Sequence, residues 1–454
     1  MMTTERDVEL CAELIDFIGE SPSMFHTAAA IRRRLDAAGF ECLPEGAAWD
    51  VRPGGSYYTV RNNSSVIAWR VGAGVDATAP VGYHFQLAAA HGDSPTFKLK
   101  AAPELPGPGD VLRLDVEAYG GMIDYTWFDR PLSLAGRVLV RGEGEAAGRI
   151  ESRLVSLDRD VALIPSLAIH LDRSVNAGFA PNRAVDLCPL FSAGDLGAGS
   201  VLQLMADELV VARNRILGHD LFLVNRQKPV VWGAAREFVS APKLDDLMCA
   251  FAALKGFLAG APGNDAAVSV YACFDNEEVG SGTKQGAMST FLRDTLARIN
   301  GALGGNDETY RRALAGSMLV SCDNAHAVHP SHPEKMDEAN RAYLNRGIVI
   351  KEAANQHYCT DAFSRAAFCA LCERAGAPYQ SFANRSDMAG GSTLGNLSNM
   401  QASMHGVDVG LPQLAMHSAY ETAGARDAAA AVKALAAFFA TDIRIDGADS
   451  IELR

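Results

Sequence analysis

Hydrophobic residues near the start of the chain recur with a helical period, and farther along they follow the pattern of strands. Residues 8–18 and 24–38 are predicted helices, which a Ser-Pro-Ser break separates. Residues 57–71 predict a β-hairpin around two asparagines, and residues 85–90 form a short apolar run that ends at His91. The first part of the chain is therefore predicted to mix helices with strands.

Helix-like stretches alternate with apolar strands in the later half of the chain. The runs AAVSVYACF and SMLVSC are apolar throughout, as is typical of strands in a parallel sheet that helices cover on both faces. Residues 96–232 differ, because they are rich in Gly, Pro and alternating strands. We therefore predict an α/β fold in which residues 1–95 and 233–454 form a mostly parallel sheet flanked by helices, interrupted by a β-rich domain at residues 96–232.

Composition narrows the class of protein. A chain of 454 residues with 48% hydrophobic and 21% charged residues is typical of a soluble globular protein large enough for two cores. Its net charge of -13 argues against nucleic acid or an anionic membrane as a partner. The N-terminus lacks the features of a signal peptide, and no apolar run reaches the length of about 18 residues that spans a membrane. Nine thinly spread cysteines favour reduced thiols in a cytoplasm.

Residues of metal-binding type follow several of the predicted strands. Ligands in open α/β sheets bind outside the carboxyl ends of the strands, so these residues are expected to gather at one edge. Two imidazoles among carboxylates suit a pair of divalent ions, with zinc favoured and manganese or cobalt as alternatives. The residues are His91, Asp245, Asp246, Glu277, Glu278, Asp323 and His417.

Each of these residues also has an ordinary structural interpretation. An acid such as Asp245 or Asp323 after a strand is often a helix N-cap, and a lone His is often a hydrogen-bonded loop residue. The adjacent pair Glu277 and Glu278 is harder to explain in this way, because two neighbouring carboxylates repel one another unless a cation compensates. The combination therefore favours a metal site over any one of the ordinary interpretations.

Other candidate motifs lead to weaker hypotheses. Pro330 lies within HAVHPSH and Pro333 directly follows it. Together they prevent a regular helix from aligning the three rings, so His326, His329 and His332 are expected at the surface or behind the site. The C-x-x-C motif lies in a helix-like stretch without a second cysteine pair, which favours two buried thiols. The chain has no H-E-x-x-H, G-x-S-x-G or dinucleotide-binding glycine motif.

Distinctive segments occur in order along nearly the whole chain. They are SPSMFHTAAAIRRRLDAAGF, AAAHGDSPTFKLK, IPSLAIHLDR, LDDL, FDNEEVGS, SCDNAHAVHP, GIVIKEAANQHY, RSDMAGGSTLG and VDVGLPQLAMHSAYE. Together these segments resemble the aspartyl aminopeptidase family, the M18 metallopeptidases. The resemblance implies an enzyme that removes N-terminal Asp or Glu from peptides with two divalent ions, most commonly zinc.

The resemblance also implies a role for each candidate residue. His91, Glu278, Asp323 and His417 would bind the ions, Asp245 would bridge them, and Glu277 would be the general base. Asp246 stands where the family commonly has Asn, which leaves open whether Asp245 or Asp246 bridges the ions.

Two further residues and an assembly follow from the same resemblance. Lys351, at the end of GIVIK, matches the family lysine that meets the acidic side chain of the substrate; otherwise it would be a solvated Lys at a strand end. The family has a β-rich dimerisation domain and assembles as a tetrahedral dodecamer. In it a histidine that matches His170 reaches the active site of a neighbouring subunit; from its surroundings alone, His170 would be an exposed ring on an alternating strand.

Three other functions compete with this interpretation. A two-metal deacylase or carboxypeptidase would use similar ligands but would recognise an acyl group or a C-terminal carboxylate. A catalytically silent shell protein would keep the fold and lack a ligand or the base, whereas all six positions are filled here. A glycosidase with paired carboxylates would need no metal.

Overall fold

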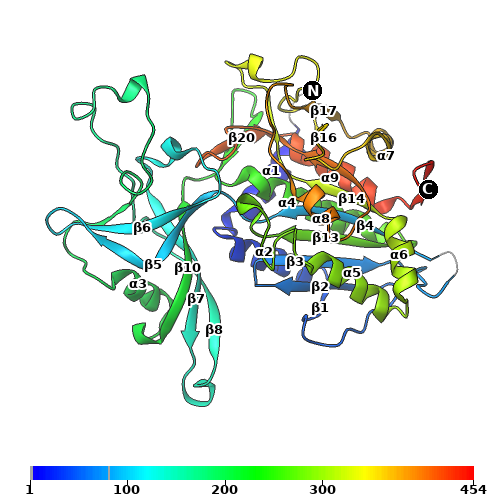
Figure 1. Ribbon diagram of the computed structural model, residues 1–454, viewed down its shortest axis with the longest axis horizontal. Helices are drawn as coiled ribbons and strands as arrows, with labels where there is room; N and C mark the ends of the chain where they lie inside the picture. The colour runs from blue at the N-terminus through cyan, green and yellow to red at the C-terminus, as the bar shows by residue number, and fades with distance from the viewer. Residues whose placement is uncertain (1–3, 80–81) are drawn as a thin grey trace.

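A nine-stranded sheet forms the centre of the larger part of the molecule in the computed structural model, which describes residues 4–79 and 82–454 (Figure 1). Residues 1–3 and 80–81 of the predicted first segment therefore lie outside the described residues. The strand order is β1-β2-β3-β13-β4-β14-β18-β16-β17. These strands are β1 (Glu41–Cys42), β2 (Ser56–Arg61), β3 (Ser65–Val71), β4 (His84–His91), β13 (Ala267–Phe274), β14 (Met318–Cys322), β16 (Ile348–Glu352), β17 (Tyr379–Ala383) and β18 (His405–Gly410).

The central strands of this sheet are parallel and buried on both faces. β13, β4, β14 and β18 pair in parallel in that order, and every residue of β4, β13 and β14 is buried. Burial on both faces explains why these strands are apolar without alternation. Antiparallel pairs join β2 to β3, β3 to β13 and β16 to β18. The predicted fold class, a mostly parallel sheet with a β-rich segment elsewhere in the chain, is confirmed.

Helices cover both faces of the nine-stranded sheet. One hydrophobic cluster joins α1, α2, α4, α7 and α9 to the face that carries Ala88 and Ala90 of β4. A second cluster joins α5, α6 and α8 to the opposite face, where Phe85, Leu87 and Ala89 point. The helices are α1 (Glu5–Gly19), α2 (Met24–Ala37), α4 (Leu244–Gly260), α5 (Phe291–Ala302), α6 (Asp307–Ala315), α7 (Ala362–Ala375), α8 (Leu394–Asn399) and α9 (Asp427–Ala440). Among the described residues, none of the helices is long and apolar enough to cross a membrane.

The middle segment, which we define as residues 96–232, forms a six-stranded antiparallel sheet of order β8-β7-β10-β5-β6-β9 with its own hydrophobic core. It lies beside the nine-stranded sheet, in cyan to green in Figure 1. Its elements are β5 (Thr96–Pro106), β6 (Leu112–Tyr119), β7 (Leu132–Arg141), β8 (Ile150–Ser156), β9 (Leu190–Ser192), β10 (Ile216–Asn225) and α3 (Ser200–Leu209), a helix that the pattern did not predict. The domain boundaries and the dimerisation role stay predictions.

A five-stranded sheet has the order β11-β12-β20-β19-β15. It is joined to the carboxyl ends of β14 and β18, because β15 follows β14 and β19 follows β18 along the chain. Its pairing of β12 with β20 places the start of α4 close to residues 417–421. The strands are β11 (Val230–Trp232), β12 (Phe238–Ala241), β15 (Ala325–His326), β19 (Pro412–Leu414) and β20 (Glu421–Gly424), and β21 (Ile443–Asp446) pairs with β22 (Ser450–Leu453) at the end of the chain. The short 3₁₀ turns are η1 (Asp124–Trp127), η2 (Gly144–Ala146), η3 (Val175–Ala177), η4 (Arg213–Arg215), η5 (Ala261–Gly263), η6 (Glu277–Val279) and η7 (Pro333–Lys335).

Helices α4 and α9 approach one another closely at a glycine. A Cβ atom at Gly260 would lie 2.2 Å from the carbonyl oxygen of Ala436 and 2.9 Å from the Cβ of Phe439. The same approach packs the rings of Phe257 and Phe439 edge to face, with centroids 5.3 Å apart. Because the nearest obstacle is backbone, a side chain at position 260 requires the two helices to separate.

We expect Gly260→Ala to lower the stability of the protein. Ala is favoured over Gly inside a helix by about 1 kcal/mol, but the forced separation of α4 and α9 costs about 1–3 kcal/mol. Gly301→Ala in α5 is the matched control, because a Cβ there meets no described atom within 4 Å. Thermal unfolding of both variants measures the difference. A rise in melting temperature for Gly260→Ala as large as that for Gly301→Ala would contradict the close-packing argument.

Candidate active site

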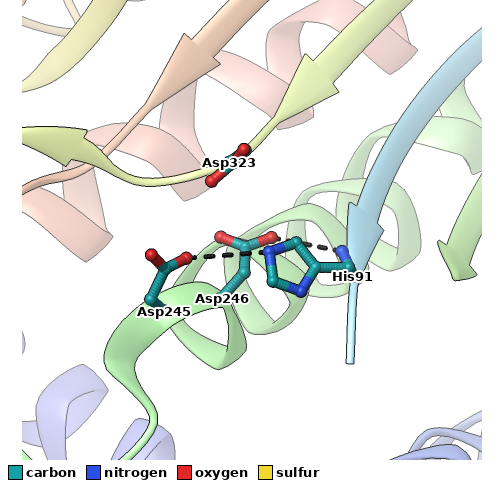
Figure 2. A group of neighbouring side chains, drawn as sticks. All are labelled: His91, Asp245, Asp246 and Asp323. Carbon is teal, nitrogen blue, oxygen red and sulfur yellow. Dashed lines mark hydrogen bonds and ion pairs between the residues drawn. The ribbon is translucent and has the colours of Figure 1, made fainter. Parts of the chain in front are cut away.

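The candidate metal-binding residues come together at the carboxyl ends of the parallel strands. His91 ends β4, Asp323 follows β14, and η6 places Glu277 and Glu278 after β13. His417 lies between β19 and β20. These side chains form three groups, in each of which one imidazole nitrogen or carboxylate oxygen per residue lies within 4.8 Å of the others. The groups are His91, Asp245, Asp246 and Asp323; His91, Glu277 and Glu278; and Asp245, Glu278 and His417. Figure 2 shows the group of His91, Asp245, Asp246 and Asp323.

The ring of His91 is buried and held from one side. Its Nδ1 donates to the carbonyl oxygen of Asp93 at 3.2 Å and lies 3.3 Å from Asp93 Oδ1. Its Nε2 faces Asp245, at 3.7 Å from Oδ1 (Figure 2). A histidine whose Nδ1 proton is bound in this way presents the lone pair of Nε2, which is the arrangement common in metal ligands.

The backbone at Asp245 and Asp246 departs from the predicted helix. Asp245 has φ −82° and ψ 112°, and Asp246 has φ −115° and ψ 22°, although both lie within the span of α4. The peptide between them is cis. The Asp245 carbonyl accepts a hydrogen bond from Ser94 Oγ at 2.7 Å, and Asp246 Oδ2 accepts one from the backbone N–H of His91 at 3.2 Å. Tertiary contacts thus place both carboxylates beside His91 (Figure 2).

His417 completes the other side of the group. Its Nε2 lies 3.5 Å from Asp245 Oδ2 and 3.4 Å from Glu278 Oε2. Burial lowers the pKa of His417, but the adjacent Asp245 and Glu278 outweigh it and raise the pKa to about 10. Burial likewise opposes ionisation of Asp245, yet His417 and His91 lower its pKa below the usual range. Asp245 is therefore the carboxylate that both imidazoles face.

Several buried carboxylate oxygens have no hydrogen-bond partner among the described residues. They are Asp245 Oδ1, Asp246 Oδ1 and Glu278 Oε1. A buried carboxylate is costly unless a cation or hydrogen-bond donor faces it. Imidazole nitrogens and carboxylate oxygens are ligands that zinc and other divalent first-row ions prefer. The residues present therefore fit divalent cations.

Asp93 holds the turn that carries Glu277 and Glu278. Its backbone N–H donates to Asp93 Oδ1 at 3.2 Å, and that of Glu278 donates to Asp93 Oδ2 at 3.2 Å. Burial raises the pKa of Glu277 to about 8; His91 opposes this rise, and Asp323 and Asp93 add to it. Because a bound cation lowers the pKa of carboxylates that face it, Glu277 would become a stronger acid in a metal-loaded site.

A cavity of about 220 Å³ opens onto these residues and contains Lys351 in its wall. Lys351 is 2% exposed, so it is not a solvated lysine at a strand end. Its Nζ donates to the carbonyl oxygen of Asp323 at 2.8 Å, lies 4.0 Å from Asp323 Oδ2 and sits 5.1 Å above the ring of Tyr358. Burial lowers the pKa of Lys351, but Asp323, Tyr358 and Asp408 outweigh it and raise the pKa. Lys351 therefore places a fixed positive charge in the cavity.

The other candidate histidines divide between this cavity and the surface. His326 lines the cavity, whereas His329 and His332 are exposed, with ring centroids 5.2 Å apart. His170 lies in an exposed turn of the middle segment and not on a strand, so the interpretation of an alternating strand there was wrong. Within the described chain, His170 is not among the residues that line the cavity.

Two acidic residues that had no predicted role hold the site together. Glu421 is buried and accepts hydrogen bonds from the backbone N–H of Asp245 at 3.0 Å and of His417 at 2.7 Å. Asp93 contacts His91 and the backbone of the glutamate pair. Glu421 begins β20 and does not directly follow a predicted strand, so the strand-end pattern did not mark it. Asp93, two residues after His91, was close enough to the motif to be suspected.

Fold and site together define an α/β metallopeptidase. A sequence model described as "Aminopeptidase I zinc metalloprotease (M18)" matches residues 17–439, and the chain belongs to this M18 family. It is 42% identical over 427 residues to a "Probable M18 family aminopeptidase 2" of Clostridium novyi, covering 92% of this chain and 96% of that protein. The corresponding protein of Pseudomonas aeruginosa (strain UCBPP-PA14) is 41% identical over 438 residues, with 95% and 98% covered.

Solved structures of the same fold agree with this assignment. A chain in the cryo-EM structure of the Ape4 and Nbr1 complex superposes with a TM-score of 0.91 and 34% identity, covering 97% of this chain and 87% of that one. The S. cerevisiae mApe1 dodecamer gives a TM-score of 0.82 with 27% identity, covering 95% and 96%.

We expect Glu421→Gln to weaken divalent metal binding by about 10–100-fold, the usual effect of losing a group that orients a ligand. Each carboxylate oxygen of Glu421 accepts one backbone N–H, and the amide of Gln would turn its NH₂ group toward one of them. Glu352→Gln is the control, because Glu352 pairs with Arg365 at 3.2 Å on a partly exposed strand end. Competition with a chelator measures both affinities, and equal values in the two variants would rule out the orienting role.

Proposed function

We propose that this chain is an aminopeptidase that removes N-terminal Asp or Glu from peptides. It would use two bound divalent ions, for which zinc is favoured and manganese or cobalt are the alternatives. The observation that carries the proposal is the shared position of Asp245. It belongs both to a group with His91 and Asp323 and to a group with Glu278 and His417. One carboxylate shared by two sets of ligands suits a pair of adjacent ions.

The proposal assigns a set of ligands to each ion. The His91 subsite comprises His91, Asp245 and Asp323, and the His417 subsite comprises Asp245, Glu278 and His417. Asp246 takes part in only one of the groups and accepts a hydrogen bond from the His91 backbone. These contacts support Asp245, and not Asp246, as the bridging ligand. The unpartnered oxygens of Asp245 and Glu278 support a cation at both subsites.

Glu277 is the proposed general base. When bound, divalent ions make a water more acidic and polarise the scissile carbonyl group. Glu277 lines the cavity beside the proposed ligands, and its carboxylate would accept the proton of the attacking water and return it to the leaving amine. Glu278 is adjacent in sequence but faces His417. The adjacent glutamates therefore receive different roles, proton transfer for Glu277 and metal binding for Glu278.

Lys351 is the proposed determinant of specificity. A protein with a net charge of -13 repels an acidic substrate unless the binding cavity contains a positively charged side chain. Lys351 supplies that cation, and its bond to the Asp323 carbonyl holds the ammonium group in place next to the proposed His91 subsite. A charged hydrogen bond to the side-chain carboxylate of Asp or Glu would then favour acidic over neutral N-termini.

The middle segment is the proposed dimerisation domain of a homo-oligomer, and the proposed assembly is a tetrahedral dodecamer. The family relative from S. cerevisiae was solved as a dodecamer, and large apolar side chains around His170 are exposed in the single chain: Leu167, Ile169 and Leu171. We propose that His170 reaches the active site of a neighbouring subunit. The cysteines of the described chain are all free, which supports a reducing, cytoplasmic setting.

We expect Glu277→Gln and Asp245→Ala to fail in different ways. Removal of a general base typically lowers activity by at least about a hundredfold and leaves the ligands in place, so Glu277→Gln should keep both ions. Asp245→Ala should lose metal as well as activity. Metal analysis of each purified variant, with hydrolysis of free and N-acetylated acidic peptides, tests the roles and separates an aminopeptidase from a deacylase. Equal metal loss in the two variants, or full turnover by metal-free protein, would contradict the proposal.

Replacing Lys351 is expected to reduce the preference for acidic residues. Lys351→Met keeps the length of the side chain in its buried position but removes a charged hydrogen bond worth roughly 1.5–3 kcal/mol, or about ten- to a hundredfold in kcat/KM for Asp and Glu substrates. Turnover of Ala and Leu substrates should change much less. The ratio of acidic to neutral kcat/KM is the quantity to measure, with metal content as the control because Lys351 contacts Asp323. An unchanged ratio would exclude Lys351 as the specificity residue.

A further inference from the structure

Residues 119–123 of the middle segment reach across to the candidate active site. This stretch begins with the last residue of β6 and continues into the loop that leads to η1. We infer that residues 119–123 hold the His417 subsite in its metal-binding geometry, so that the middle segment controls the occupancy of this subsite and not that of the His91 subsite. The inference rests on the proposed function, because it takes Glu278 and His417 as metal ligands.

His417 is bound to this stretch through both its ring and its backbone. The ring Nδ1 donates to the carbonyl oxygen of Gly121 at 2.9 Å, and the backbone N–H of Ile123 donates to the carbonyl oxygen of His417 at 2.9 Å. The first bond leaves Nε2 directed at Asp245 and Glu278, where it would be free to bind an ion. His417 also has a positive φ of 66°, a conformation that non-glycine residues adopt only when their surroundings impose it. The middle segment supplies part of those surroundings.

Glu278 is packed directly against Gly120. A Cβ atom at Gly120 would lie 3.1 Å from the Cβ of Glu278 and 3.4 Å from its carbonyl oxygen. Gly120 has φ +85°, so position 120 favours glycine on two grounds, its backbone conformation and the lack of space. Any side chain at position 120 would therefore push against the backbone that carries the Glu278 carboxylate.

Tyr119 supports the turn that carries Glu278 through Asp93. Its hydroxyl donates to Asp93 Oδ2 at 2.7 Å and accepts from Asn276 Nδ2 at 2.8 Å. Asp93 Oδ2 is also the oxygen that accepts the backbone N–H of Glu278. The Tyr119 ring is fixed edge to face against Phe222, with centroids 5.6 Å apart. A residue of the middle segment thereby fixes the turn that presents the proposed base and ligand.

The His91 subsite is supported from within the nine-stranded sheet. The backbone N–H of Asp323 donates to the carbonyl oxygen of Val409 in β18 at 3.0 Å, and Lys351 of β16 holds the Asp323 carbonyl. His91 Nδ1 is held by the backbone carbonyl of Asp93 at 3.2 Å, whereas the Tyr119 hydroxyl binds the Asp93 side-chain carboxylate, whose Oδ1 also lies 3.3 Å from Nδ1. The two subsites therefore differ in which part of the chain orients their ligands.

Gly120→Ala tests this asymmetry, with Gly109→Ala as its matched control. Both glycines have positive φ, +85° and +64°, but a Cβ at Gly109 meets no described atom within 4 Å. After dialysis against a zinc buffer set by a chelator, wild type and Gly109→Ala should hold two zinc ions per chain. Gly120→Ala should hold one tightly and bind the second about 10–100-fold more weakly. Equal binding in Gly120→Ala and Gly109→Ala, or equal weakening of both ions in Gly120→Ala, would overturn the inference.

Tyr119→Phe provides a milder second variant that keeps the packing of the ring. It should weaken the same single ion, whereas Tyr58→Phe should not, although the Tyr58 hydroxyl is buried and donates to Asp36 Oδ1 at 2.7 Å. Wild-type affinity for both ions in Tyr119→Phe would exclude a role for the hydroxyl bond.

Single-subsite backgrounds identify which ion is affected. In a His417→Ala background, adding Gly120→Ala should leave the affinity of the remaining ion unchanged; in a His91→Ala background it should weaken the remaining ion by the same 10–100-fold. The reverse pattern would overturn the inference. Failure of the wild-type chain to bind two ions would instead refute the proposed two-metal function, so the two failures are distinguishable.

Discussion

Burial of several carboxylates side by side is the constraint on which the site depends. Asp245, Asp246, Glu278 and Asp323 gather at one edge of the sheet, and oxygens of the first three lack a hydrogen-bond partner within the described chain. Such a cluster repels itself in a poorly solvated environment, and imidazoles alone cannot neutralise it. The ligands are therefore held in place by the surrounding fold until cations offset the repulsion, which explains why so many backbone hydrogen bonds converge on them.

The sequence predicted the framework because its signals are local. Apolar runs such as those of β13 and β14 mark strands buried on both faces, and the residues that follow them meet at one edge by topology alone. The signal failed where long-range contacts decide the conformation. The extended backbone at Asp245 depends on Glu421, which lies 176 residues away, and the burial of Lys351 depends on its neighbours across the sheet. His170 was assigned to a strand because apolar residues alternate around it, although they lie in an exposed turn.

The middle segment is largely a separate sheet, but one stretch of it contacts the candidate active site. Most of it forms a separate antiparallel sheet with its own core, which suits a role in assembly. Its stretch at residues 119–123 instead contacts the proposed ligands Glu278 and His417 through backbone atoms. An element whose glycines and carbonyl groups complete a site cannot be exchanged freely for another β-rich domain. The proposed assembly through this segment and the proposed metal binding at the His417 subsite would therefore share one connection.

The position of Lys351 links the proposed specificity to the proposed metal site. Its ammonium group is bound by the carbonyl of Asp323 and stands 4.0 Å from the Asp323 carboxylate. A cation there competes electrostatically with an ion in the proposed His91 subsite, since like charges in a buried site repel. An incoming acidic side chain would offset that repulsion by pairing with Lys351, whereas a neutral side chain would not. Recognition of the acidic residue would therefore reduce the charge conflict beside the proposed His91 subsite, and preference for acidic substrates would follow from the arrangement that holds the metal ligands.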